Sequence, residues 1–389
     1  MRISTELSPY SFLSQRLSYA RRNAIDVVNL VENVPSWPTP PAPAAAAVPE
    51  MLTYAPAEGA DALLDALASR ENRQIARAKG LLPDLPGPVI STRNILVTNG
   101  ATQAISLILQ SLPSGPRTIL CQSPVFIGIV RLMTAHGFNV LYLPADQPIA
   151  AATAAMMSDK VAAIYLNSPN NPTGTVVPAA EISKLLTLAK TWKARVLIDA
   201  VYEDFCFDGV TPDLPRQPGN NQLYLVNSIS KNYGAPGLRV GWIVSSAANI
   251  EVLGGQLERE CVAVGGYAQL CAATLLSRSN AELVAHVERS RAPIYAALKS
   301  VPGLTYFPTS AGTQLLAHLD VPDIEAFADF SLLKHGLILA TTSNYGGLNS
   351  QSIRIPLGLP RGHILNGIPI LAQSLTDFGV ATRSVVHAT

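Results

Sequence analysis

Short apolar and β-branched runs alternate along most of this chain with longer segments whose apolar residues recur at helical spacing. The runs occupy residues 94–98, 118–122, 139–143, 162–167, 195–200, 223–228 and 239–245. Each run has the length of a buried strand, and the segments between them can form crossover helices. This order predicts an α/β fold with a mainly parallel sheet flanked by helices.

The length of the chain predicts more than one domain. It has 389 residues, of which 48% are hydrophobic and 14% charged, so it can bury a large core. Helical spacing continues from Gly254 to Leu298, and mixed strand and helix patterns follow. We expect a large domain over residues 50–290 and a smaller α+β domain formed by residues 1–49 and 291–389.

Charge and hydropathy patterns argue against several classes of partner. The net charge is +1, and no basic block is interleaved with aromatic residues, so nucleic-acid binding is not expected. Residues 1–22 contain no apolar run of signal-peptide length, and polar residues interrupt the uncharged stretch 94–116. We therefore expect a cytoplasmic protein without a membrane span.

The cysteines are scattered rather than clustered. Cys121, Cys206, Cys261 and Cys271 lack metal-ligand spacing, and their neighbours are mostly apolar. We expect reduced, buried thiols and no metal site.

The segment Ser228–Trp242 places one lysine among hydroxyls, glycines and an arginine. A partly desolvated lysine such as Lys231 can form a Schiff base with an aldehyde, and Arg239 can clamp a phosphate. The hydroxyls of Ser228 and Ser230 can reach phosphate oxygens. An aldehyde that carries a phosphate is pyridoxal phosphate, so the segment points to that cofactor. A lysine taken alone is more often a solvated residue in a turn.

Further candidates follow the predicted strands, at the edge where ligands gather in parallel α/β sheets. Gly100, Ala101 and Thr102 join a strand to a helix, where backbone N–H groups can bind an anion or the residues can simply cap the helix. Asn171 lies in the loop 167–174, whose prolines and glycine can hold its amide toward a ligand. A rigid surface turn is the alternative for that loop.

Two charged residues end or interrupt apolar strands and need partners. An unpaired carboxylate at Asp199 would be costly to bury, and a pyridinium nitrogen would supply the missing cation. A helix N-cap is the alternative for Asp199. Arg354 has apolar neighbours and requires a planar anion such as a carboxylate, with a structural salt bridge as the alternative.

The segment around Lys231 resembles the lysine signature of the class I/II aminotransferases, which are pyridoxal phosphate enzymes of fold type I. Every position of their pattern S-x-S-K-x(4)-P-G-L-R-x-G is filled between Ser228 and Gly241. The N-P-T-G sequence at 171–174 and the D-x-x-Y sequence at 199–202 resemble two further motifs of that family. The resemblance implies that Lys231 carries the cofactor as a Schiff base and acts as general base and acid.

The resemblance also implies which residues hold the cofactor. Those expected at the phosphate are Gly100, Ala101, Thr102, Ser228, Ser230 and Arg239. Those expected at the ring are Phe126, which stacks on it, Asn171 and Tyr202, which reach its phenolic oxygen, and Asp199, which pairs with its nitrogen.

Substrate binding and assembly follow from the same resemblance. Arg354 is expected to bind the α-carboxylate of the substrate, and Tyr54 to reach the phosphate of a neighbouring subunit in a homodimer. The loop 29–35 resembles that of histidinol-phosphate-aminotransferase-like members, and it places Asn33 with Asn171 among the substrate-binding candidates.

We therefore expect an aminotransferase that moves an amino group between an L-amino acid and a 2-oxo acid. A lyase, decarboxylase or oxidase of the same fold would keep the same residues and is the main alternative. A ligand-sensing regulator is disfavoured because the cofactor-domain motifs begin near Tyr54. A pseudoenzyme is disfavoured because Lys231, Asp199 and Arg239 are all present.

Overall fold

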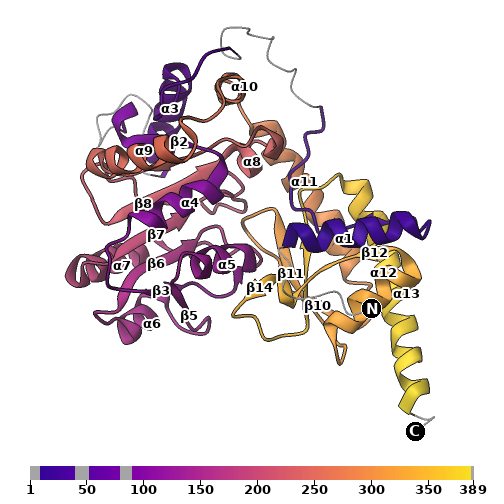
Figure 1. Cartoon of the computed structure of the whole chain (residues 1–389). Coiled ribbons are helices and arrows are strands. Elements are labelled where there is room, and N and C mark those ends of the chain that lie inside the picture. Colours follow the sequence, from indigo (N-terminus) through magenta and orange to yellow (C-terminus); the bar gives the residue numbers. More distant parts are fainter. Residues whose placement is uncertain (1–8, 40–51, 79–89, 387–389) are drawn as a thin grey trace.

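A seven-stranded, mainly parallel sheet forms the larger part of the molecule (Figure 1). The computed structural model describes residues 9–39, 52–78 and 90–386. The strand order is β2 (Ile95–Thr98), β9 (Gly241–Val244), β8 (Leu223–Ser228), β7 (Arg195–Asp199), β6 (Val161–Asn167), β3 (Thr118–Cys121) and β5 (Asn139–Tyr142). Only β9 runs antiparallel to its neighbours in this sheet. The predicted fold class is confirmed.

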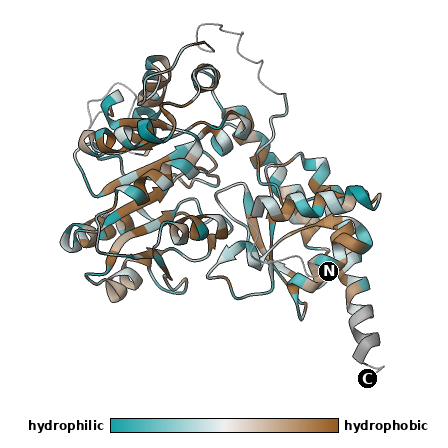
Figure 2. Ribbon diagram, in the orientation of Figure 1, coloured by the Kyte–Doolittle hydropathy of each residue, from teal (hydrophilic) through white to brown (hydrophobic). Residues whose placement is uncertain are grey.

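Helices cover both faces of this sheet because its strands are apolar on both sides (Figure 2). Along β7, Val196 and Ile198 belong to one core cluster, and Leu197 between them belongs to the other. The first cluster includes residues of α3 (Asp61–Ala78), α6 (Ile149–Met156), α7 (Ala179–Trp192) and α10 (Gly266–Leu276). The second includes residues of α4 (Gly100–Ser111), α5 (Ile127–Ala135) and α9 (Ala247–Cys261).

A second, antiparallel sheet lies beside the first, in the order β10 (Leu304–Tyr306), β11 (Gln314–Leu319), β15 (Ser352–Pro356) and β13 (Ala340–Thr341) (Figure 1). A third core cluster packs it against α11 (Ala281–Leu298), α12 (Ile324–His335) and α13 (Arg361–Val386). The apolar face of α11 belongs to this cluster from Leu283 onward. The division at about residue 290 stays a prediction.

Short elements connect these two parts. Near the N-terminus, α1 (Pro9–Arg22) precedes β1 (Val28–Asn29), which pairs in parallel with β12 (Leu337–Ile338). β4 (Val125–Phe126) pairs with β14 (Tyr345–Gly346). The remaining elements are η1 (Thr92–Asn94), α8 (Ile229–Asn232), η2 (Pro236–Leu238) and η3 (Thr342–Asn344).

Two expectations from the sequence need correction. The helical pattern from 254 to 298 is divided among α9, α10 and α11, because Val262 turns into the left-handed region with φ 65° and ends α9. Cys121 and Cys206 are buried as expected, but Cys271 is only half-buried, and Cys261 is exposed because it lies at the last turn of α9. Within the described residues, no helix is both long and apolar enough to cross a membrane.

Candidate active site

A cavity of about 160 Å³ lies at the carboxyl ends of the strands of the large sheet. It is lined by Ala101, Thr102, Ile105, Phe126, Ile129, Tyr165, Asn167, Asn171, Asp199, Val201, Tyr202, Ser228, Ser230, Lys231, Pro236 and Arg239. The chain therefore gathers most of the predicted cofactor-binding residues around one space, although they come from segments far apart in the sequence.

Lys231 lies on the short helix α8, which follows β8 directly. Its Nζ donates a hydrogen bond to the backbone oxygen of Asn33 at 2.7 Å. Burial, together with the nearby cations Arg354 and Arg239, lowers the pKa of Lys231 to about 8. More of this amine is therefore neutral near neutral pH than of an ordinary lysine, as a nucleophile requires.

Asp199 ends β7 and is buried. Its Oδ2 accepts a hydrogen bond from the Tyr165 hydroxyl at 2.9 Å, and its Oδ1 accepts one from the Val201 N–H at 3.2 Å. Burial raises the pKa of Asp199 to about 6. No lysine, arginine or histidine among the described residues forms an ion pair with it. A cationic ligand atom facing this carboxylate would satisfy it.

The N-terminus of α4 and Arg239 together form a cradle for an anion. Gly100 has φ +79°, and a Cβ built on it would lie 2.5 Å from Nη2 of Arg239. The preceding Asn99 makes no side-chain cap to α4. The first N–H groups of α4 and the guanidinium of Arg239 thus point to the same end of the cavity, where a phosphate fits.

Arg354 lies on β15 and is buried. Its Nη2 donates to the backbone oxygen of Val31, while its buried Nε has no hydrogen-bond partner. No carboxylate of the described residues pairs with it. The alternative of a structural salt bridge is not supported, and a free planar anion remains the partner that fits.

Asn33 ties the N-terminal loop to the site. Its Nδ2 donates to the Tyr202 hydroxyl at 3.1 Å and to Oε1 of Gln314 at 2.6 Å. Its Oδ1 accepts a hydrogen bond from the Thr313 hydroxyl at 2.9 Å. The Asn33 side chain is therefore committed to protein partners, whereas Asn171 lines the cavity.

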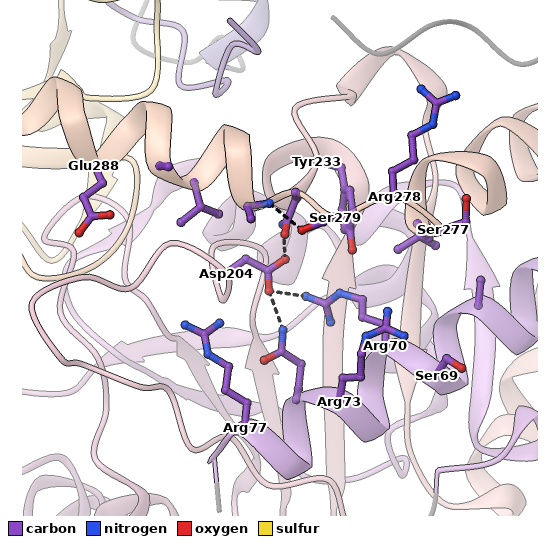
Figure 3. A pocket seen from close by; sticks show the side chains of 17 residues that line it. Ser69, Arg70, Arg73, Arg77, Asp204, Tyr233, Ser277, Arg278, Ser279 and Glu288 are labelled. Carbon is purple, nitrogen blue, oxygen red and sulfur yellow. Dashed lines mark hydrogen bonds and ion pairs between the residues drawn. The ribbon is translucent and has the colours of Figure 1, made fainter. Parts of the chain in front are cut away.

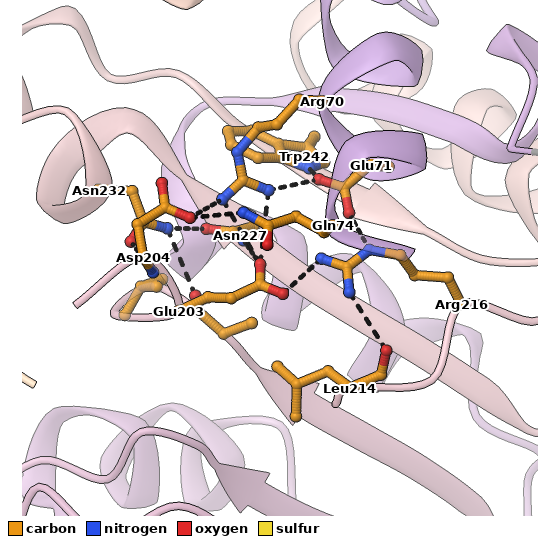
Figure 4. A network of polar contacts seen from close by, with 12 residues as sticks. Arg70, Glu71, Gln74, Glu203, Asp204, Leu214, Arg216, Asn227, Asn232 and Trp242 are labelled. Atoms are coloured by element: carbon orange, nitrogen blue, oxygen red, sulfur yellow. Dashed lines mark hydrogen bonds and ion pairs between the residues drawn. The ribbon is translucent and has the colours of Figure 1, made fainter. Parts of the chain in front are cut away.

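A buried polar network holds the two halves of the site in place (Figure 4). Glu203 and Asp204 follow Tyr202, and Asn227 and Asn232 flank the segment that carries Lys231. These residues are connected by hydrogen bonds from Asn227 to Glu203 at 3.0 Å, from Asn232 to Asn227 at 2.8 Å and from the Asp204 N–H to Asn232 at 3.1 Å. Arg70 and Arg216 neutralise the carboxylates of the network. The network fixes the Tyr202 turn against α8.

A larger cavity of about 820 Å³ borders this network (Figure 3). Arg70, Arg73 and Arg77 of α3 form one wall, and α11 contributes Glu288. Its lining residues include no lysine and none of the predicted site residues. The smaller cavity is therefore the candidate active site.

Gly100, Asn33 and Arg354 do not line the cavity but contact residues that do or lie next to them, whereas Tyr54 lies elsewhere. Its side chain is 86% exposed, and it lines a different cavity with Gly266 and Gln269. It does not reach the cavity around Lys231 in the same chain.

Sequence reasoning missed several residues of the site. Tyr165 faces Asp199 from the middle of β6, and Tyr345 donates to Oδ1 of Asn171 at 3.5 Å. Nothing in their sequence surroundings distinguishes these tyrosines from core residues. Gln314 was detectable, because it is a polar residue that begins the apolar strand β11.

Comparisons with known proteins agree on the family. The profile of the family Aminotransferase class I and II matches residues 25–368. The L-aspartate:5-guanidino-3-methyl-2-oxopentanoate transaminase of Pseudomonas syringae pv. syringae is 37% identical, covering 95% of this chain and 95% of that protein. The 3-methylarginine biosynthesis aminotransferase of Streptomyces arginensis is 32% identical, covering 85% of this chain and 87% of that protein. The solved aspartate aminotransferase of Thermotoga maritima matches with a TM-score of 0.81 and 20% identity, covering 96% and 98% of the two chains.

Proposed function

Because the chain belongs to the class I and II aminotransferases, we propose that the cavity around Lys231 is its active site and holds its pyridoxal phosphate. The enzyme moves amino groups between amino acids and 2-oxo acids. The observation that carries the proposal is the meeting of three groups at one cavity. These are a lysine of lowered pKa, a buried carboxylate without a cationic partner among the described residues, and an arginine at the N-terminus of a helix.

The residues present fit pyridoxal phosphate. When bound, this cofactor supplies an aldehyde that combines with amines and a ring that withdraws electrons from the carbon bearing the amino group. Arg239, Ser228, Ser230 and the first N–H groups of α4 would hold its phosphate. Asp199 would pair with its ring nitrogen, Asn171 and Tyr202 would bind its phenolic oxygen, and Phe126 would cover the ring.

Lys231 would perform the proton transfers. Its amine would be the group that holds the aldehyde of the cofactor, and it would move the proton at the substrate Cα as general base and acid. The lowered pKa suits both roles, because the neutral amine is the nucleophile and the base. Arg354, whose buried Nε has no hydrogen-bond partner among the described residues, would orient the substrate by binding its α-carboxylate.

We further propose that the substrates include a guanidino 2-oxo acid as amino acceptor, with L-aspartate as donor. Two relatives that cover most of the chain support this choice by their names, one for 5-guanidino-3-methyl-2-oxopentanoate with L-aspartate and one for 3-methylarginine biosynthesis.

The functional unit is proposed to be a homodimer in which Tyr54 of each subunit completes the phosphate site of the other. The high exposure of Tyr54 and its distance from the cavity of its own chain support this arrangement.

The test is amino transfer from L-aspartate to 5-guanidino-2-oxopentanoate, followed by measurement of the arginine formed. We expect this acceptor to give a kcat/KM at least about tenfold above that of 2-oxohexanoate, which lacks the guanidinium. Transfer to other 2-oxo acids, with none to the guanidino acceptor, would overturn the proposed substrate and leave the active-site assignment standing.

A further inference from the structure

The loop Val31–Asn33 contacts both cations of the candidate active site. The Val31 carbonyl accepts a hydrogen bond from Arg354, and the Asn33 carbonyl accepts one from Lys231. These two cations are the groups proposed to face the α-carboxylate and the Cα of the substrate. Glu32 lies between these two residues in the chain, so its backbone is adjacent to the contacts with both cations, although Glu32 does not line the cavity itself.

The backbone of Glu32 is held in place, although its side chain is exposed to solvent. The next residue, Asn33, is anchored on both sides of its amide by Tyr202, Gln314 and Thr313. A rigid neighbour limits how far the Glu32 backbone can move. The Glu32 side chain thus starts from a well-defined backbone position.

The Glu32 carboxylate has no hydrogen-bond or ion-pair partner among the described residues, whereas Arg16, Arg70, Arg216 and Arg291 each hold carboxylates elsewhere in the chain. The Glu32 carboxylate interacts electrostatically with Lys231. It raises the pKa of Lys231, whereas burial, Arg354 and Arg239 lower that pKa. Asp199 lies in the cavity, but it is committed to the ring nitrogen by the proposed function.

We propose that Glu32 is the residue that recognises the cationic end of the substrate, by pairing its carboxylate with the guanidinium group. This inference rests on the proposed function, since it presumes a guanidino substrate. A carboxylate and a guanidinium can form two parallel hydrogen bonds, which select a guanidinium over a neutral group of the same shape. Glu32 is a specificity residue and does not touch the reacting atoms.

The test compares arginine with citrulline as amino donors to the holoenzyme, because citrulline has the same length and a neutral ureido group. In Glu32→Gln, kcat/KM for arginine should fall about 10- to 100-fold, the range expected for a lost charge-assisted hydrogen bond. For citrulline it should change less than about threefold. Titration calorimetry measures the affinity for 5-guanidinopentanoate, which has no amino group to transfer. In Glu32→Gln this affinity should fall by the same factor as kcat/KM for arginine.

Glu251→Gln is the matched control, because Glu251 is an exposed glutamate on α9 that does not line the cavity. Glu251→Gln should leave kcat/KM for both arginine and citrulline unchanged. Equal losses for arginine and citrulline in Glu32→Gln, or an unchanged preference for arginine, would overturn the role of Glu32. A wild-type enzyme that transaminates other amino acids and does not prefer arginine to citrulline would overturn the substrate class, and the inference with it.

Discussion

At the scale of single residues, the two cations of the candidate site are held by backbone carbonyls rather than by carboxylates. Lys231 donates to Asn33 and Arg354 donates to Val31. A carbonyl is a weaker partner for a cation than a carboxylate, so both groups can exchange it for an anionic or aldehyde-bearing ligand at modest cost. The site is therefore poised for binding.

Replacing Arg354 by leucine tests its proposed role in carboxylate binding. The change should lower kcat/KM for every amino-acid substrate by about 30- to 1000-fold, equivalent to about 2–4 kcal/mol, because the pairing with the α-carboxylate is lost. Melting temperature and cofactor absorbance should stay close to those of the wild type, since no described carboxylate loses a partner. Unchanged kinetics with a large loss of stability would make Arg354 a structural residue.

The pKa of Lys231 predicts how the apoprotein combines with pyridoxal phosphate. The neutral amine attacks the aldehyde, so the rate should rise as the pH rises and reach its midpoint near pH 8 rather than near 10.5. Arg354→Leu should move the midpoint upward, because Arg354 is one of the cations that disfavour the ammonium. A midpoint above pH 10 in the wild type would show that Lys231 is not desolvated.

Part of the site could be predicted from the sequence because its residues stand out locally. Lys231, Asn171 and Asp199 lie in unusual loops or at strand ends, where polar residues after an apolar run indicate a ligand. Tyr165 could not be predicted, because a tyrosine in an apolar strand is ordinary core. The partners of Asn33 could not be predicted either, because Thr313 and Gln314 are distant in sequence and meet it only through the fold.

At the scale of elements, the ends of β7 and β8 depend on the buried network of Arg70, Glu71, Glu203 and Arg216 (Figure 4). Arg216 pairs with Glu71 at 2.5 Å and with Glu203 at 2.6 Å. Each carboxylate is buried, so each requires its cation. The network therefore holds the residues of the site in position and takes no part in the reaction.

Arg216→Met should lower the free energy of unfolding by about 3–5 kcal/mol, because the buried carboxylates of Glu71, Glu203 and Asp204 would share the one remaining arginine, Arg70. Chemical denaturation measures this change. Lys184→Met is the matched control, since Lys184 forms an exposed pair with Glu181 on α7, and its removal should change the free energy by less than about 1 kcal/mol. Equal effects of the two variants would contradict the importance assigned to the network.

The sequence predicts the strands of the large sheet better than the helices that follow it. A buried strand is a short apolar run with clear ends, and each run named from the sequence coincides with one of the seven strands to within two residues at either end. Helical spacing, in contrast, continues across Val262 and Asn280, where the chain leaves one helix and enters the next. Local signals mark both breaks, because Gly265 and Gly266 lie at the start of α10 and Asn280 is a favoured N-cap residue for α11, although the apolar spacing continues through them.

At the scale of the whole molecule, the N-terminal segment crosses between the two parts of the fold. It pairs with β12 through β1 and then reaches Tyr202 and Lys231 through Asn33. The sequence indicates that residues 1–49 join the small domain, but it does not show that the same segment contacts the catalytic lysine. Such contacts depend on how the two sheets are placed side by side (Figure 1).

The proposed dimer predicts complementation between two defective chains. Tyr54→Phe should weaken retention of pyridoxal phosphate about tenfold, because a hydrogen bond to the phosphate is lost. Mixed dimers of Tyr54→Phe and Lys231→Ala should each regain one intact site, with Lys231 from one chain and Tyr54 from the other. If the activity of the mixed dimers did not exceed the average activity of the two parent dimers, Tyr54 would not act across an interface.

The most direct test of the whole account is a half-reaction on the purified holoenzyme with L-aspartate and no acceptor. The cofactor absorbance should shift fully to that of pyridoxamine phosphate, and 5-guanidino-2-oxopentanoate should then reverse the shift with formation of an equal amount of arginine. Lys231→Ala should show neither change, while Lys184→Ala should match the wild type. Release of carbon dioxide or of a substrate fragment without pyridoxamine phosphate would instead identify a decarboxylase or lyase and contradict the account.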